Sequence, residues 1–157
     1  MSISNPPANP TTAHCAADWL LAESLAPHVQ GDPLQPLYDF AARGVLAMPF
    51  CAHCDLALEL EQQRCDGCGA LEMLWRQVEP VGEVHAATMM HRRERGLVVA
   101  EQPYPIVDVE LVSSHRIVVT TVTPCPAAPP IGARVFLGFR RLGAATIPAI
   151  EYSKGSS

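Results

Sequence analysis

Two Cys-x-x-Cys motifs constrain this chain more than any other feature of its sequence. The first is Cys51-Ala-His-Cys54 and the second is Cys65-Asp-Gly-Cys68, with ten residues between them. A two-residue spacing lets one tight turn direct both sulfurs toward the same ion. Four thiolates in a tetrahedral array suit Zn²⁺ and leave no coordination position open for water or substrate. The four cysteines are therefore predicted to hold one structural zinc ion per chain.

The residues around these motifs refine the prediction. Rubredoxin-type iron uses the same four ligands, so the spacing leaves iron open, although a short ribbon without a redox partner favours zinc. His53 lies inside the first motif, but with four cysteines present it is expected at the surface. Gly67 and Gly69 are expected to give the second turn the backbone freedom it needs. A ribbon of this size cannot bury a sufficient core, so the metal is expected to hold it together and not to perform chemistry.

The composition of the 157 residues is that of a packed protein, with 48% hydrophobic and 17% charged residues. No apolar run is long enough to span a bilayer, and no signal peptide is recognisable at the start. Residues 1–14 are predicted to be a disordered lead-in and residues 153–157 a tail. Reduced, paired cysteines fit a cytoplasmic location. Eleven basic against sixteen acidic residues give a net charge of −5, which disfavours a long polyanion as ligand.

Residues 15–44 are predicted to form N-terminal helices. His14 to Ala26 carries several large apolar residues and then meets a proline, which stops a helix. An Asp-Pro pair is a start signal for a second helix over residues 33–43. Its apolar residues recur at the spacing of one helix face, and Gly44 supplies the stop.

From about Val81 the apolar residues alternate with a period of two, which is typical of strands. Strand-like runs are predicted at residues 83–90, 107–111, 117–121, 135–139 and 146–150. In the first run, one face is expected to consist of Val84, Ala86, Thr88 and Met90. The runs are separated by prolines and glycines, which indicates a small barrel. The histidines on or beside these runs are expected at the strand surface, and they are His85, His91 and His115.

The sequence shows no catalytic signature. It has no Gly-rich phosphate loop, no Gly-x-Ser-x-Gly and no His-Glu-x-x-His. Cys15 and Cys125 remain outside the paired motifs, and neither has a neighbouring histidine and carboxylate in the sequence that would activate a nucleophile. Cys125 lies between two prolines and is expected in a loop or at a strand end. No catalytic residue is predicted.

A series of motifs in fixed order points to a known family. The motifs are Pro36-Leu-Tyr-Asp-Phe-Ala-Ala-Arg-Gly44, the two cysteine pairs, Val81-Gly82-x-Val84-x-x-x-Thr88, Pro103-Tyr104-Pro105-Ile106-Val107-x-Val109-Glu110-Leu111 and Ile131-Gly132-Ala133-Arg134-Val135. Over residues 33–150 the chain resembles the acyl-CoA-associated proteins that combine a rubredoxin-like zinc ribbon with an OB-fold, long described as a domain of unknown function. It departs from them at Ser113-Ser114, where the family usually turns with glycine, and in a first strand poorer in glycine and serine.

The resemblance implies a mainly β chain with N-terminal helices, a zinc ribbon at residues 45–75 and a small OB-fold barrel at residues 76–152. Members are small partners of thiolase-like enzymes, including steroid side-chain retro-aldolases, acyltransferases that acetylate phloroglucinols, and archaeal thiolase/hydroxymethylglutaryl-CoA synthase assemblies. It therefore implies a non-catalytic accessory subunit in a hetero-oligomer, which docks a thiolase-like subunit and shapes or shields its acyl-CoA channel.

Two other functions stay open at this stage. A zinc ribbon joined to an OB-fold is also the build of proteins that bind single-stranded nucleic acid, although only 6% of the residues here are aromatic. A free-standing small enzyme that uses a histidine of the barrel is the other alternative.

Two groups of residues are candidates for function beyond the metal. Arginine is the side chain best suited to phosphate oxygens. Three arginines are therefore expected near the CoA phosphates, with a solvated surface as the alternative, and they are Arg92, Arg93 and Arg95. The residues expected to contact the partner, or else to seal the ribbon against the barrel, are Phe50, Leu74 and Trp75.

Overall fold

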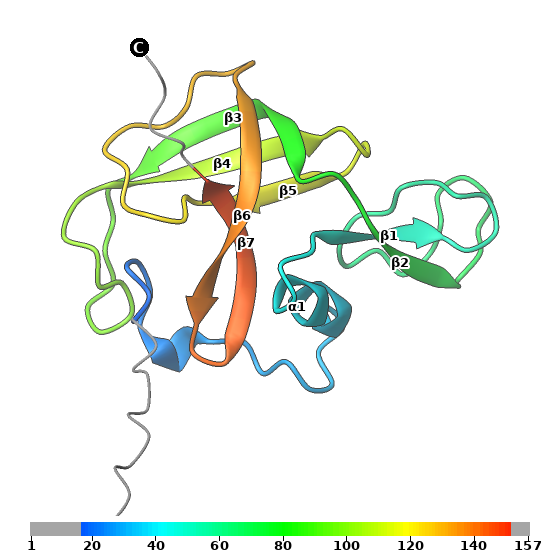
Figure 1. Ribbon diagram of the computed structural model, residues 1–157, viewed down its shortest axis with the longest axis horizontal. Coiled ribbons are helices and arrows are strands. Elements are labelled where there is room, and N and C mark those ends of the chain that lie inside the picture. Colours follow the sequence, from blue (N-terminus) through cyan, green and yellow to red (C-terminus); the bar gives the residue numbers. More distant parts are fainter. Residues whose placement is uncertain (1–16, 152–157) are drawn as a thin grey trace, which may run out of the picture.

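The computed structural model describes residues 17–151, which form a barrel with a small ribbon projecting from one side (Figure 1). The elements are η1 (Glu23–Leu25), α1 (Gln35–Ala41), β1 (Ala47–Cys51), β2 (Met73–Gln77), β3 (Val81–Met90), β4 (Tyr104–Leu111), β5 (Arg116–Val119), β6 (Arg134–Leu142) and β7 (Ala145–Glu151). The predicted fold class is confirmed, because a mostly β chain carries one short α-helix, a nearly closed barrel and a four-cysteine site.

The strands form two antiparallel sheets. β1 and β2 pair alone in the ribbon, while the barrel has the strand order β5-β4-β3-β6-β7. A parallel bridge between Thr121 and Ile150 brings the two edges together, and the N–H of Ile150 donates to the carbonyl of Thr120 over 2.8 Å. The ribbon strand β2 ends only four residues before β3 begins. The short connection holds the ribbon close to the barrel.

The main core fills the barrel and continues into the ribbon. Alternation along β4 buries Val107, Val109 and Leu111 and leaves Asp108 and Glu110 on the outer face. Leu37 of α1 and Met48 of β1 join the same cluster, and α1 lies between the barrel and the ribbon (Figure 1). A second, much smaller core lies around the cysteines. The ribbon therefore has little apolar core of its own beyond the cluster of cysteines.

The N-terminal helices are only partly as predicted. The second helix is present as α1, and the Asp32 carboxylate accepts the N–H of Leu34 over 2.7 Å just before it. The first predicted helix is wrong in its described part, because residues 17–26 are extended apart from the single turn η1. The reason is tertiary pairing: Leu21 forms a bridge with Val98 of the β3–β4 loop. Among the described residues, neither helical segment is long and apolar enough to cross a membrane.

A β-bulge in β3 overturns part of the predicted alternation. The pairing with β4 shifts between Val84 and Ala86, so His85 is an extra residue without a partner. Val84 is buried as expected, but Ala86 is exposed and Ala87 packs against the core instead. The prediction that Ala86 shares a face with Val84 is therefore wrong, because one inserted residue exchanges the two faces of the strand.

Candidate metal centre

The four cysteine sulfurs predicted to bind metal lie together, all within 4.8 Å of one another. Sγ of Cys51 is 3.6 Å from Sγ of Cys68, and Sγ of Cys54 is 3.5 Å from Sγ of Cys65. A disulfide would need about 2.0 Å. Around an ion with metal–sulfur bonds of about 2.3 Å, tetrahedral sulfurs lie about 3.8 Å apart. The arrangement therefore fits a four-thiolate metal such as zinc.

The two cysteine turns have the same backbone geometry. In each, the N–H of the first cysteine donates to the carbonyl five residues later, over 2.8 Å in the first turn and 2.9 Å in the second. Its carbonyl accepts the N–H four residues later, over 3.1 and 2.9 Å. That fourth residue is left-handed in both turns, as Asp55 (φ 61°) and Gly69 (φ 74°). The freedom predicted for Gly69 is therefore confirmed.

Gly67 has a different role from the one predicted. Its φ does not lie in the left-handed region. A side chain there would instead meet the metal site, because a Cβ atom would lie 3.3 Å from Cδ2 of Leu56 and 3.6 Å from Sγ of Cys65. Gly67 is needed for close packing against the sulfurs.

Backbone N–H groups and neighbouring sulfurs both shift the pKa values of the cysteine thiols at this site. The N–H groups of Cys54 and His53 lower the pKa of the Cys51 thiol to about 6. The N–H of Leu56 also lowers the pKa of Cys54, but the sulfur of Cys65 and desolvation outweigh it and raise that pKa to about 12. Close sulfurs thus oppose the formation of further thiolates, and a divalent metal is the natural partner that would favour them in this donor set.

A buried histidine joins the ribbon to the barrel. His115 is 4% exposed, so the expectation that it lies on a strand surface is wrong. Its Nε2 lies 2.8 Å from the carbonyl oxygen of Pro49 in β1, and its Nδ1 lies 2.8 Å from the hydroxyl of Ser113. A carbonyl can only accept, so Nε2 carries the proton and Nδ1 accepts from Ser113. Burial lowers the pKa of His115, which keeps the ring neutral.

Two of the three predicted partner contacts are half-buried and pack against other residues of the chain. The Phe50 and His115 rings meet edge-on, with their centroids 4.8 Å apart. The Arg76 guanidinium lies 4.1 Å from the centroid of the Phe50 ring. Trp75 packs against the main core, whereas Leu74 is 52% exposed. That these residues contact a partner stays a prediction, and Leu74 is the member with a free surface.

The three candidate arginines lie in the exposed loop between β3 and β4. Arg92 forms an ion pair with Glu94 over 2.7 Å, and Arg93 donates to the carbonyl of Ala100 over 3.4 Å. Arg95 is exposed next to Gly96. The loop lies on the opposite side of the barrel from the ribbon (Figure 1). The two candidate groups are therefore well separated.

The remaining singled-out residues have ordinary environments. His53 is exposed as expected, and its Nε2 lies 3.5 Å from a carboxylate oxygen of Glu72. His85 and His91 are also exposed. Cys125 is in a loop, where its thiol donates to the carbonyl of Ala127 over 3.1 Å. Cys15 and the predicted lead-in and tail lie outside the described residues.

Sequence reasoning missed a buried ion pair between Asp18 and Arg140. The Asp18 side chain is 1% exposed, and it also accepts the N–H groups of Leu20 and Leu21. One carboxylate oxygen and Nε of Arg140 have no hydrogen-bond partner in the described structure. The two residues are 122 positions apart, and no local motif connects them.

Comparison with known proteins agrees with this geometry. Residues 75–140 match the family model of the ChsH2 C-terminal OB-fold domain. A solved structure, the "Ltp2-ChsH2(DUF35) aldolase", is similar with a TM-score of 0.68 and 23% identity, over 80% of this chain and 98% of that chain. At this identity the likeness shows a shared fold. No curated protein matches the sequence. The resemblance predicted from the sequence is confirmed, and residues 75–140 of this chain match the ChsH2 C-terminal OB-fold family.

Proposed function

We propose that this protein is a non-catalytic accessory subunit of a thiolase-like enzyme complex that acts on acyl-CoA. It docks the thiolase-like subunit and shapes or shields the acyl channel, in a carbon–carbon lyase of the retro-aldolase type or a C-acyltransferase. The observation that carries this proposal is the extent of the structural likeness. The match spans 98% of the chain in the Ltp2-ChsH2(DUF35) aldolase, so the ribbon and the barrel correspond as one unit. Because that solved structure is an aldolase by name, the lyase is favoured over the acyltransferase.

The chemistry available to the described residues supports a non-catalytic role. A four-thiolate site leaves no position at which a metal could bind water or substrate. Both ring nitrogens of the buried His115 are occupied by hydrogen bonds. The Cys125 thiol donates to a backbone carbonyl, and no histidine is paired with it in residues 17–151. A nucleophile with its base is more naturally supplied by the thiolase-like partner.

Binding of single-stranded nucleic acid is disfavoured by the outer face of the barrel. OB-folds bind such ligands on the face of their second and third strands, which are β4 and β5 here. This face carries Asp108 and Glu110, with Glu83 beside them on β3. Its cation Arg116 is already paired with Asp108. A phosphate backbone would be repelled.

The loop of Arg92, Arg93 and Arg95 is proposed to approach the CoA phosphates at the mouth of the partner's channel. In support, all three side chains are exposed in one short loop, and arginine matches phosphate oxygens in charge and geometry. Replacing the three with alanine should raise the KM of the complex for acyl-CoA without loss of assembly. A variant with alanine at the exposed Arg43 and Arg141 is the control. An unchanged KM at low ionic strength, where screening is weakest, would assign the loop to the solvated surface.

Co-purification tests the proposed function itself. The tagged chain is expressed in its own host, and the captured proteins are separated by size-exclusion chromatography and identified by mass spectrometry. The expected result is a stoichiometric thiolase-like partner and acyl-CoA turnover by the complex but not by the chain alone. Robust turnover by the partner-free chain would contradict the proposal. The reduced thiol site would place this complex in the cytoplasm.

A further inference from the structure

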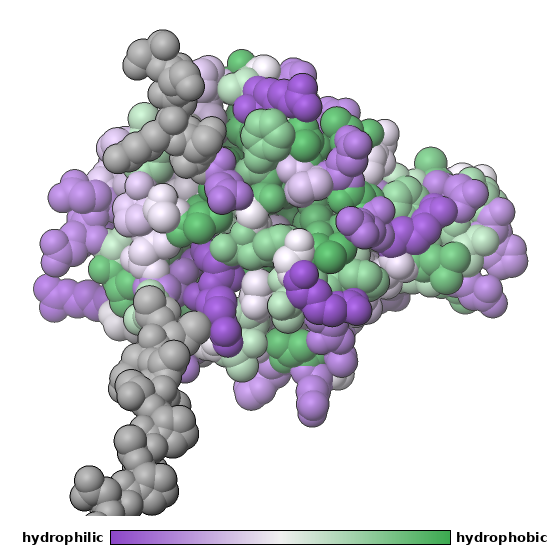
Figure 2. Space-filling view, viewed as in Figure 1, coloured by the Kyte–Doolittle hydropathy of each residue, from purple (hydrophilic) through white to green (hydrophobic). Residues whose placement is uncertain are grey.

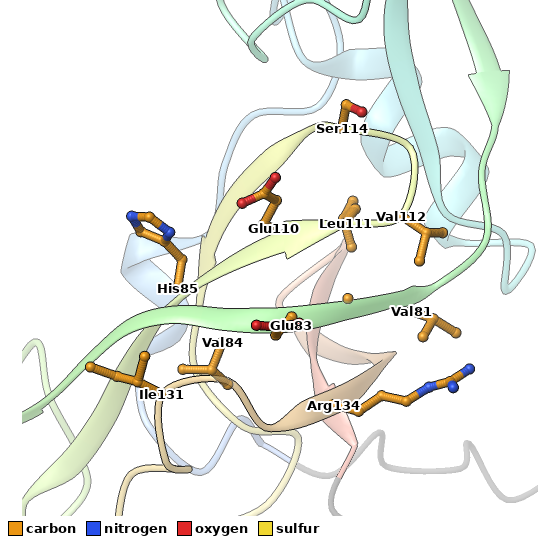
Figure 3. A pocket seen from close by; sticks show the side chains of 11 residues that line it. Val81, Glu83, Val84, His85, Glu110, Leu111, Val112, Ser114, Ile131 and Arg134 are labelled. Carbon is orange, nitrogen blue, oxygen red and sulfur yellow. The ribbon is translucent and has the colours of Figure 1, made fainter.

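A groove of about 760 Å³ crosses the outside of the barrel, where β3 begins. Its walls come from the first half of β3, from the end of β4 with the turn after it, and from the loop and strand start at β6 (Figure 3). Gly82 lets β3 and β4 approach closely beside the groove, because a Cβ atom there would lie 2.5 Å from the carbonyl oxygen of Glu110 and 2.6 Å from Cγ1 of the buried Val109. The concavity is therefore built into the strand crossing of the barrel.

The groove is bordered by large apolar side chains that the fold leaves in water. Ile131 is 74% exposed and Val112 is 59% exposed, and both line it. Phe136, half exposed, pairs in register with the lining residue Val81. Figure 2 shows apolar side chains gathered over the upper ends of β6 and β3, with charged side chains beside them. A cluster of this kind with a polar rim is typical of a protein interaction site.

The charges on the rim indicate what kind of partner fits. Glu83 and Glu110 face each other directly across β3 and β4, and both are exposed. Like charges directly opposite each other destabilise a sheet. Arg134 lies opposite Glu83 and Arg116 lies opposite Glu110 on the neighbouring strands. Within residues 17–151, however, neither glutamate has a cation within ion-pair distance, and the Arg134 guanidinium lies 5.5 Å from the Phe136 ring centroid. A cation from outside would relieve this repulsion.

We propose that this groove is the docking surface for the thiolase-like partner, and that the partner inserts an apolar side chain flanked by lysine or arginine. The inference rests on the proposed function and names a surface different from that of Phe50 and Trp75, which are half-buried against the main core. Burying an exposed isoleucine and valine would supply the apolar contact. Two unpaired carboxylates would supply orientation and a salt-sensitive association rate.

The test compares variants of the full chain in the capture experiment, with affinity measured on the purified partner. Ile131→Asp and Val112→Asp change side chains that are already exposed, so the fold should survive. Val118→Asp is the matched control, because Val118 is 65% exposed on β5 and does not line the groove. Zinc content and melting temperature are measured for each variant. A chain truncated after Glu151, which pairs with Phe136 at the groove, tests whether its own last residues occupy it.

The proposal expects roughly 100-fold weaker partner binding for each groove aspartate variant and little change for Val118→Asp. Glu83→Gln with Glu110→Gln should weaken binding about tenfold at low salt and flatten its salt dependence. Unchanged binding by both aspartate variants overturns the groove assignment while leaving the proposed function intact. Failure of the wild-type chain to capture any thiolase-like protein overturns both. If Ile131→Asp converts a dimer of this chain into a monomer, the groove is instead the contact with a second copy. If truncation tightens partner binding, the groove is instead occupied by the chain's own last residues.

Discussion

Replacing His115 with phenylalanine should weaken the joint between ribbon and barrel. The phenylalanine ring keeps the edge-on contact with Phe50 but loses the hydrogen bonds to the carbonyl of Pro49 and the hydroxyl of Ser113. Each such bond contributes about 0.5–1.5 kcal/mol net. The Pro49 carbonyl keeps a second donor, the N–H of Leu58 at 3.0 Å, so no group is left wholly unsatisfied. The expected loss is therefore about 1–3 kcal/mol, the sum of the two bonds.

The assay is urea unfolding at pH 7.5, followed by circular dichroism and by the fluorescence of the two tryptophans. His85→Phe is the control, since His85 is exposed in the bulge and should change stability by less than about 0.5 kcal/mol. A His115→Phe variant as stable as the wild type would refute the hydrogen-bonded joint.

The pH dependence gives an independent check of the same histidine. Burial lowers the pKa of His115 below its value in the unfolded chain. The unfolded state then binds more protons than the folded state below about pH 6.5, so the contribution of His115 is complete above that pH and is lost on acidification. The stability difference between wild type and His115→Phe should shrink from pH 7 to pH 5. Zinc loss on acidification affects both proteins alike, so a difference that grows would contradict a neutral buried ring.

Four further predictions concern stability and the metal. Elemental analysis should find one zinc per chain, and Cys65→Ser should lose the metal and unfold the ribbon, whereas Cys125→Ser should keep both. Gly82→Ala should cost about 1–3 kcal/mol in urea unfolding, because its Cβ would meet the Glu110 carbonyl oxygen at 2.5 Å; no loss would mean that the strands can separate there. Ser114→Gly should stabilise by about 0.5–1 kcal/mol because φ of Ser114 is 71°, whereas Ser113→Gly should destabilise by removing a partner of His115. Asp18→Ala should cost about 3–5 kcal/mol by leaving Arg140 buried and unpaired, and Asp18→Leu with Arg140→Met should recover most of this if the penalty is the lone charge.

The features that could be predicted from the sequence are those set by residues a few positions apart. The cysteine spacing identified the metal ligands, and the two-residue period located each barrel strand, because both depend on neighbours a few positions apart. Similar proteins usually have glycine at the turn between β4 and β5. The left-handed φ of Ser114 explains this preference, because glycine adopts such a φ without strain.

Features made by distant pairs were not predictable. The segment before Ala26 has helical composition, but Leu21 pairs with Val98 and Asp18 with Arg140, so tertiary contacts replace the helix. His115 resembles its exposed neighbours in the sequence, and only the carbonyl of Pro49, 66 positions away, explains its burial. In the same way, the groove joins residues from three segments of the chain.

The bulge at His85 has a consequence for how relatives of this chain can differ in length. Val84 pairs with Val109 and Ala86 with Asp108, which are consecutive residues of β4. Loss of His85 would therefore turn an irregular stretch into a regular ladder and keep Val84 and Ala87 directed toward the core. Loss of Ala86 would have the same effect, because His85 would then pair with Asp108, whereas loss of a residue farther along β3 would exchange the inner and outer faces beyond that point. In an alignment of homologues, the single-residue gaps in this strand should fall at position 85 or 86.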